Sequence, residues 1–180
     1  MKATGIVRRI DDLGRVVIPK EIRRTMRIRE GDPLEIYTTG EGEVIFRKYS
    51  PVGEILAFST QYADVLYKAA SMPVIVCDKD HVIAVSGIPK KEIIERRISP
   101  ALEESMLQRI NIACTDANCN KIKPVEGIQR FALCSSPIIA AGDICGCILF
   151  LSSDETSLAT DCQIKLIQVA SAFLAKQLED

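Results

Sequence analysis

Hydrophobic and polar positions change their spacing near residue 54, and this change predicts two kinds of structure. Before it, apolar residues occur in short β-branched runs separated by turn residues, which is typical of strands. After it, two stretches carry apolar residues at alternating spacings of three and four, which is typical of amphipathic helices. The first stretch begins at Ile55 and the second at Ile164, and several strand-like runs lie between them. The pattern therefore predicts a small β-rich domain followed by a larger α+β domain.

The first fifty residues are expected to contain four short strands and one short helix. Gly14 can take the positive φ of a turn between the first two strands, and Pro19 suits the first turn of the helix. The strands are expected at residues 6–10, 15–18, 34–37 and 44–47, and the helix at residues 20–26. A unit of this size without a disulfide or a metal site is near the lower limit for an independent core. We therefore expect two copies to fold together as an obligate dimer.

The apolar pattern of the rest of the chain predicts a sheet domain between two long helices. Strands are expected at residues 73–77, 81–85, 131–134 and 144–151, and a shorter helix at residues 101–113. The last helix is apolar on two sides, so we expect one side to contact its own sheet and the other to contact another subunit. The residues expected at this subunit contact are Ile55, Phe58, Tyr62, Ile164, Ile167, Leu174 and Leu178.

Charge is divided unequally along the chain. Residues 1–30 hold nine Lys or Arg against four Asp or Glu, a net charge of +5, whereas the whole chain carries −1. Seven of the nine cations are arginine, whose planar guanidinium donates two parallel hydrogen bonds to phosphate or to a guanine edge. A solvated basic surface without a partner is the simpler interpretation. An arginine-rich patch in an otherwise acidic chain nevertheless favours a polyanion, and double-stranded DNA above all.

The N-terminal sequence also resembles a known family. Residues 4–19 read TGIVRRIDDLGRVVIP, and they are followed by EIRR at 21–24 and GDPLEIY at 31–37. These motifs are similar to the AbrB-type transition-state regulator domain. The resemblance implies a swapped-hairpin barrel in which two chains interleave their strands. It also implies that DNA is contacted by Arg8, Arg15, Arg23 and Arg24, with Arg9 on the same surface.

Taken as a whole, the chain resembles two-domain sporulation regulators of spore-forming bacilli. This resemblance implies a GAF-like second domain and a homotetramer held by helices flanking that domain. It implies an activator or repressor of late forespore genes, or a protein that does both. We therefore expect a DNA-binding domain at residues 1–50, a linker at 51–55 and a GAF-like domain at 56–180. Whether the GAF-like domain binds a small molecule or serves assembly alone is left open.

Other functions have weaker support in the sequence. An antitoxin of the same swapped-hairpin fold, with a protein partner, is the main alternative, although such antitoxins carry a flexible acidic tail. The lone histidine, His81, has no nucleophile motif beside it and no phosphate-binding glycine loop is present, so we expect no enzyme and no cofactor. No apolar run is long enough for a membrane span, which favours a cytoplasmic protein.

Seven cysteines, none of them before residue 77, favour reduced thiols over a disulfide framework. Their spacing does not favour a metal site either. Cys114 and Cys119 lie in a polar loop, where they are expected to be two ordinary thiols or, as the alternative, a redox-active pair.

Overall fold

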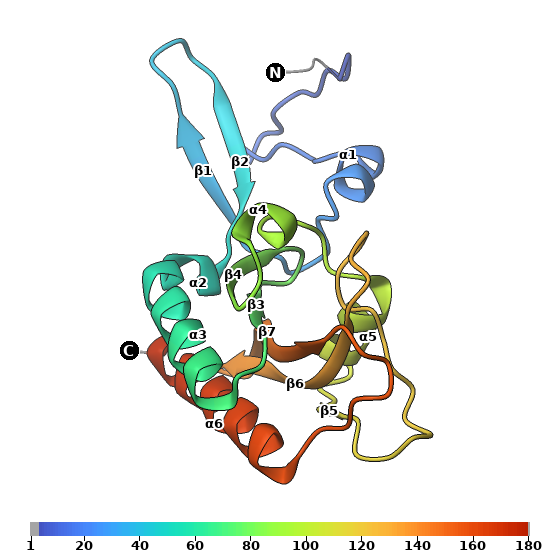
Figure 1. Cartoon of the computed structure of the whole chain (residues 1–180). Helices are drawn as coiled ribbons and strands as arrows, with labels where there is room; N and C mark the ends of the chain where they lie inside the picture. The colour runs from blue at the N-terminus through green and yellow to red at the C-terminus, as the bar shows by residue number, and fades with distance from the viewer. Residues whose placement is uncertain (1–3, 180) are drawn as a thin grey trace. The chain divides into compact units, whose positions relative to one another are not determined.

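The computed structural model describes residues 4–179, apart from the side chain of Glu54, and divides into two compact units between Tyr49 and Ser50 (Figure 1). The N-terminal unit holds helix α1 (Lys20–Thr25) and an antiparallel hairpin of β1 (Leu34–Thr38) and β2 (Val44–Lys48). The predicted hairpin and helix are therefore confirmed.

The segments at residues 6–10 and 15–18 form no strand, contrary to the sequence prediction. They flank the expected turn, in which the amide of Gly14 donates to the carbonyl of Asp11 (3.0 Å) and the amide of Asp11 to the carbonyl of Arg15 (3.0 Å). Beyond the turn no described segment of the same chain pairs with them. A strand requires a neighbouring ladder to satisfy its backbone groups, and β-branched composition alone does not supply one.

The C-terminal unit is built on a five-stranded antiparallel sheet with the order β4-β3-β7-β6-β5. Its two long central strands are hydrogen-bonded to each other over most of their length. Buried residues occupy both faces of these strands, so their sequences are almost continuously apolar. The strands are β3 (Val74–Cys77), β4 (Val82–Ser86), β5 (Ile112–Ala113), β6 (Phe131–Ala140) and β7 (Asp143–Ser152).

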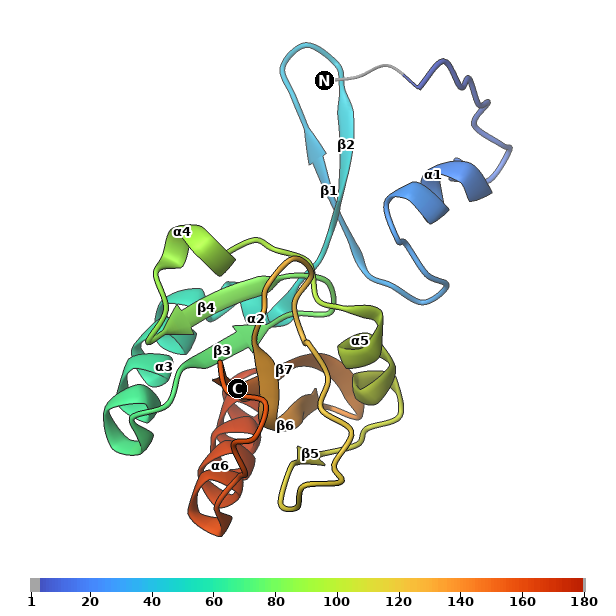
Figure 2. The same ribbon diagram turned by 45° about the vertical axis from the view of Figure 1, so that its right-hand side comes forward.

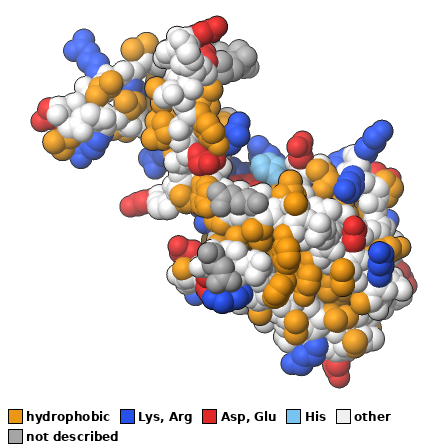
Figure 3. Space-filling model, turned by 90° about the vertical axis from the view of Figure 1, so that its left-hand side faces the viewer, with side chains coloured by type: hydrophobic (Ala, Val, Ile, Leu, Met, Phe, Trp, Pro, Cys, Tyr) orange, Lys and Arg blue, Asp and Glu red, His pale blue; other side chains and the backbone are white. Residues whose placement is uncertain are grey.

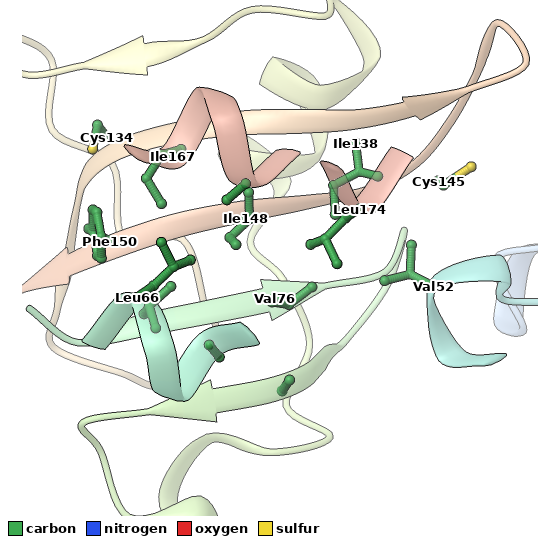
Figure 4. Packing of buried hydrophobic residues seen from close by; sticks show 14 of the residues in the cluster. Val52, Leu66, Val76, Cys134, Ile138, Cys145, Ile148, Phe150, Ile167 and Leu174 are labelled. Carbon is green, nitrogen blue, oxygen red and sulfur yellow. The ribbon is translucent and has the colours of Figure 1, made fainter. Parts of the chain in front are cut away.

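Helices cover both faces of this sheet and give the unit three layers. One face packs against α3 (Leu56–Ala70) and α6 (Asp161–Gln177), which lie side by side in both ribbon views (Figures 1 and 2). The opposite face packs against α4 (Lys90–Ile93), α5 (Pro100–Leu107) and the loops around them. Side chains of β7 alternate between the two cores: Ile148 and Phe150 belong to the first (Figure 4), and Leu149 and Leu151 belong to the second.

Two predicted boundaries differ from the structure. The helix expected to reach Ala113 ends at Leu107, because Arg109 takes a left-handed φ of 58° and the chain then turns into β5. Residues 51–55, expected to be a linker, include helix α2 (Pro51–Glu54), whose Val52 is fully buried in the core of the C-terminal unit.

Close backbone approach explains one glycine in the sheet. A Cβ atom on Gly146 of β7 would overlap the carbonyl oxygen of Cys77 in β3, and it would also press on Val52. Only glycine leaves room for the two strands and α2 to meet at this point.

Candidate nucleic-acid interface

Exposed arginines gather in the N-terminal unit. Arg8 and Arg9 precede the turn at residues 11–15, and Arg23 and Arg24 lie in the last turn of α1. Pro19 is buried and takes a φ of −57°, a value suited to the start of α1 at the next residue. All four arginines are exposed, two on a segment without regular secondary structure and two on α1.

Arg15 differs from the other four because it is held by an acid. Its Nε donates to Oδ2 of Asp11 (2.8 Å), while Oδ1 of Asp11 accepts from the backbone amides of Leu13 (3.0 Å) and Arg15 (2.8 Å). These hydrogen bonds from Arg15, backbone and side chain, lower the pKa of Asp11. The Arg15 side chain is still 69% exposed, so the ion pair orients the guanidinium without covering it.

The backbone groups of two further residues of the basic segment, Arg27 and Arg29, contribute to the fold. Lys48 on β2 donates to the carbonyl of Arg27 (3.0 Å) and lies 3.6 Å from the carboxylate of Asp32. The same carboxylate accepts from the amide of Arg29 (2.9 Å). This cluster ties the loop after α1 to the hairpin, and Arg27 and Arg29 are only partly exposed. The cationic surface is thus narrower than the nine basic residues of the sequence suggest.

Apolar side chains of the N-terminal unit are largely uncovered. Pro19 is the one buried residue among the described residues 4–49. Val7 is 86% exposed and Val17 70%, although both are β-branched and strand-forming. The large apolar side chains exposed in this unit are Ile6, Val7, Ile10, Leu13, Val16, Val17, Met26, Ile36, Tyr37, Val44 and Phe46. Exposed apolar surface of this extent is typical of a protein–protein contact site.

A second apolar surface lies on α3 and α6 of the C-terminal unit, where Figure 3 shows hydrophobic side chains gathered on the face that carries α3. Phe58, Tyr62 and Phe173 form an aromatic cluster with ring centroids 5.3 to 6.2 Å apart. Val65 and Val169 beside them are 59% and 61% exposed. Phe173 was not among the predicted contact residues, because it is not part of the series of apolar residues spaced alternately by three and four that begins at Ile164.

The structure separates the predicted oligomer-contact residues into two groups. Ile167 and Leu174 are fully buried against the chain's own sheet (Figure 4), so their assignment to a subunit contact is wrong. They hold α6 to its own domain, because both belong to the core cluster that includes Ile148 and Phe150 of β7. The other five are only partly buried: Ile55, Phe58, Tyr62, Ile164 and Leu178.

A cavity of about 500 Å³ opens at the edge strand β4. Its apolar wall is formed by Leu56, Val82, Ile83 and Ile94, with Gly53 of α2 beside them. Three polar side chains also line it: Asp78, His81 and Glu95. In the sequence, the sign of this cavity is the lone histidine, His81, beside a turn.

The cysteines fall into three chemical environments. Cys114 and Cys119 form a disulfide, so the expectation of two ordinary thiols is wrong. Burial raises the pKa of Cys134 and of Cys147 to about 12, and it raises the pKa of Cys77 and Cys145 as well. These four thiols stay protonated and act as small apolar residues. Cys162 is free and exposed.

Among the side chains that the structure describes, no three of His, Cys, Asp or Glu come together as a metal would require. None of the helices within residues 4–179 has both the length and the apolar character needed to cross a bilayer.

Comparison with known proteins finds a matching family for each of the two units. Residues 54–179 match the family described as stage V sporulation protein T C-terminal, transcription factor, and residues 7–54 match antidote-toxin recognition MazE, bacterial antitoxin. Stage V sporulation protein T of Bacillus subtilis (strain 168) is 49% identical over 181 residues, which span 99% of each chain. The transition state regulatory protein AbrB of the same organism is 61% identical over 51 residues, 28% of this chain and 52% of that protein.

The C-terminal unit also has structural neighbours. The GAF domain of an Acinetobacter phosphoenolpyruvate-protein phosphotransferase aligns with a TM-score of 0.52, covering 71% of this chain and 87% of that one at 8% identity. At that identity the likeness concerns the fold alone.

Together these findings define a two-domain transcription factor, with an AbrB-like domain followed by a GAF-like domain. The predicted fold class is confirmed in this form. The chain belongs to the stage V sporulation protein T family, because the relative of that name matches it over nearly its full length.

Proposed function

We propose that this protein regulates sporulation genes by binding double-stranded DNA through two copies of its N-terminal unit. The observation that carries the proposal is the coincidence of two features in one small unit. Exposed arginines lie beside an apolar surface that a single chain leaves uncovered. A second copy would cover that surface and would double the number of guanidinium groups on one face.

The proposed DNA contacts are Arg8, Arg9, Arg15, Arg23 and Arg24. With at least four arginines engaged in each chain, a dimer would contact about eight phosphates or base edges. Counterion release then predicts a slope of roughly −7 for log K against log salt. α1 has only six residues and is the one helix among the described residues 4–49, which excludes a helix-turn-helix within this unit, so strands, the turn and α1 would share the contacts. DNA shape and deformability would supply part of the specificity.

Pairing through the N-terminal unit also accounts for the unpaired segments at residues 6–10 and 15–18. Their β-branched residues are exposed, and their backbone lacks ladder partners within the described chain. Strands from a second copy would satisfy the backbone and cover the side chains in one step. This is the swapped-hairpin dimer that the family resemblance implies.

The apolar surface on α3 and α6 is the proposed contact between dimers. Its aromatic cluster and the exposed Val65 and Val169 form one patch, flanked by the predicted contacts Ile55 and Ile164. Burial already raises the pKa of Tyr62, as expected for a phenol at the edge of an apolar surface. A homotetramer built this way would link two DNA-binding dimers, and the second DNA contact would become intramolecular.

The GAF-like domain is the proposed sensing domain, and the cavity at β4 is its candidate ligand site. Aliphatic walls with Asp78 and Glu95 in the lining would suit a small molecule that has an apolar body and a cationic group. Such a ligand would shift the equilibrium between regulator states only as far as it binds them differently. This would allow one protein to activate some promoters and repress others.

We infer a regulator rather than an antitoxin, although residues 7–54 match an antitoxin family. The chain continues into a folded GAF-like domain instead of a flexible acidic tail, and its relative over the full length is a sporulation protein. Isolation of a small toxin bound to the purified protein would favour the antitoxin instead.

The proposal is tested by fluorescence anisotropy with a labelled duplex of about 30 base pairs and the full-length protein, measured across salt concentrations from about 50 to 300 mM. We expect binding at low salt with a steep salt dependence. Failure to bind the duplex at the lowest salt would contradict the proposal.

A further inference from the structure

The Cys114–Cys119 disulfide closes a short loop immediately after β5. The two Cα atoms are 5.3 Å apart, within the usual range for a disulfide. Cys114 is buried, and its amide donates to the carbonyl of Leu133 on β6 (3.0 Å). Cys119 is only partly buried and lies among exposed polar residues. One cysteine is therefore anchored to the sheet through its backbone, and the other is partly exposed to solvent.

The loop between the two cysteines is shaped by its own hydrogen bonds. The amide of Asn118 donates to Oδ1 of Asp116 (2.8 Å), and the amide of Cys119 donates to the carbonyl of Asp116 (3.3 Å). These bonds do not depend on the disulfide, so they would hold the thiols near each other when the bond is broken. A reduced pair in such a turn closes again readily, because the effective concentration of one thiol near the other is high.

The same loop holds the segment that leads into α6. The carbonyl of Cys114 accepts from the amide of Ala159 (2.6 Å). Two residues beyond Cys119, Lys121 donates to the carbonyls of Ser157 (2.6 Å) and Glu155. The segment thus makes three hydrogen bonds to residues at or beside the two cysteines.

α6 starts directly after these contacts. Thr160 caps the helix by accepting from the amide of Gln163 (3.3 Å), and Gln163 accepts from the amide of Thr160 (2.9 Å). Because Thr160 is the neighbour of Ala159, a change in the loop acts next to the first residue of the helix.

The pair is chemically distinct from the other cysteines. Four of the others are buried in the cores, and burial raises the pKa of each of these thiols. Cys162 is exposed, but no second cysteine is bonded to it in the described chain. Only Cys114 and Cys119 combine access with a neighbouring partner sulfur, which is typical of reversible disulfides.

We propose that Cys114 and Cys119 form a reversible thiol–disulfide site that exchanges with low-molecular-weight disulfides, and that its redox state sets how firmly residues 155–159 are attached ahead of α6. Disulfides of proteins kept in a reducing compartment are usually redox-sensing rather than permanent. The attachment is firm when the bond is closed and loosens when it is opened.

The exchange balances in two steps. The Cys119 thiolate attacks a small disulfide, forms a mixed disulfide and releases one small thiol. The Cys114 thiolate then attacks the Cys119 sulfur, closes the protein disulfide and releases the second small thiol. The protein loses two electrons and two protons, and the small disulfide gains both. Reduction by two small thiols reverses the sequence.

An effect on assembly rests on the proposed function, because α6 contributes to the apolar surface that would join two dimers. Loosening the start of α6 would weaken that contact. The redox chemistry and the attachment of residues 155–159 do not depend on assembly, so they are measured separately from it.

The first test counts thiols in the full-length protein after equilibration in glutathione buffers of increasing oxidised fraction. After unfolding and alkylation, mass spectrometry counts a cysteine as modified when it carries either the alkyl group or a glutathione, and it is expected to find seven modified cysteines in reduced glutathione and five in oxidised glutathione. The C119S variant should give six in both buffers, while the control C162S should still lose two modified cysteines on oxidation. Seven in every buffer, or five in every buffer, would overturn the proposal.

The second test measures hydrogen exchange of the peptide that contains residues 155–159. Reduction should speed its exchange about tenfold or more, since opening the loop removes a chain constraint. C119S should exchange quickly in both buffers, and C162S should behave like the unmodified protein. The core strand β3 should not change. Equal exchange of the 155–159 peptide in the two buffers would show that the bond does not control this segment.

Discussion

The double variant R23A/R24A removes two exposed guanidinium groups from the last turn of α1 in each chain, and so four from a dimer. At about −0.9 per phosphate contact, the slope of log K against log salt should fall in steepness from roughly −7 to about −3.6. At about 0.1 M salt the loss of four counterion-releasing contacts corresponds to a reduction in affinity of about three to four orders of magnitude. Fold stability should change little, because exposed arginines contribute little to folding.

Fluorescence anisotropy against salt gives the slope, and circular dichroism gives the melting temperature of the same samples. The matched control is K90A/K91A, which removes the same charge from exposed positions of α4 in the C-terminal unit. That control should keep the slope of the unmodified protein. An unchanged slope for R23A/R24A, or an equal loss for both variants, would refute the assignment of the DNA contacts to α1.

Three further predictions concern folding and assembly. V17D should prevent pairing of the N-terminal units, since Val17 is 70% exposed in the single chain and a dimer would bury an unpaired charge there. Sedimentation velocity should show the loss of the dimer for V17D and an unchanged assembly for the control L107D. L174A should cost about 2–5 kcal/mol in urea unfolding because Leu174 is fully buried, whereas V169S should weaken tetramer formation and leave unfolding within about 0.5 kcal/mol. Because the pKa of Asp11 is lowered in the folded chain, its carboxylate stabilises the turn fully above pH 3.8, the ordinary pKa of Asp, and this stabilisation is lost as the pH falls through the lower folded pKa. An NMR pH titration should therefore find that the chemical shift of the Arg15 amide changes below pH 3.8. A change centred at or above 3.8 would contradict the hydrogen-bonded turn.

Local patterns predicted the elements that are fixed by local contacts. The hairpin at residues 34–48 and the helices α3 and α6 follow from turn residues and from apolar spacing, and both signals act within a few residues. The sheet strands β3 and β7 were recognisable as apolar runs because both of their faces are buried.

Features that depend on distant parts of the chain could not be predicted in the same way. Residues 6–10 have strand composition, but pairing depends on whether a partner ladder lies beside them. The two apolar sides of α6 look alike in sequence, and only the packed structure shows that Leu174 faces the sheet while Val169 faces solvent. The bond between Cys114 and Cys119 depends on the path of a polar loop that has no periodic pattern.

The arginine surface was predicted in outline and refined by the structure. Composition alone does not distinguish Arg27 and Arg29 from Arg23 and Arg24. In the structure, the backbone carbonyl of Arg27 accepts from Lys48 and the backbone amide of Arg29 donates to Asp32. The ion pair between Arg15 and Asp11 likewise depends on the turn geometry and not on the charge count.

The central claim is that two N-terminal units together form the DNA-binding surface, and sedimentation equilibrium of the full-length protein with a short duplex tests it most directly. The protein should be a dimer or a multiple of dimers without DNA, and every DNA-bound species should contain an even number of chains. A stable monomer, or a complex of one chain with one duplex, would contradict the claim.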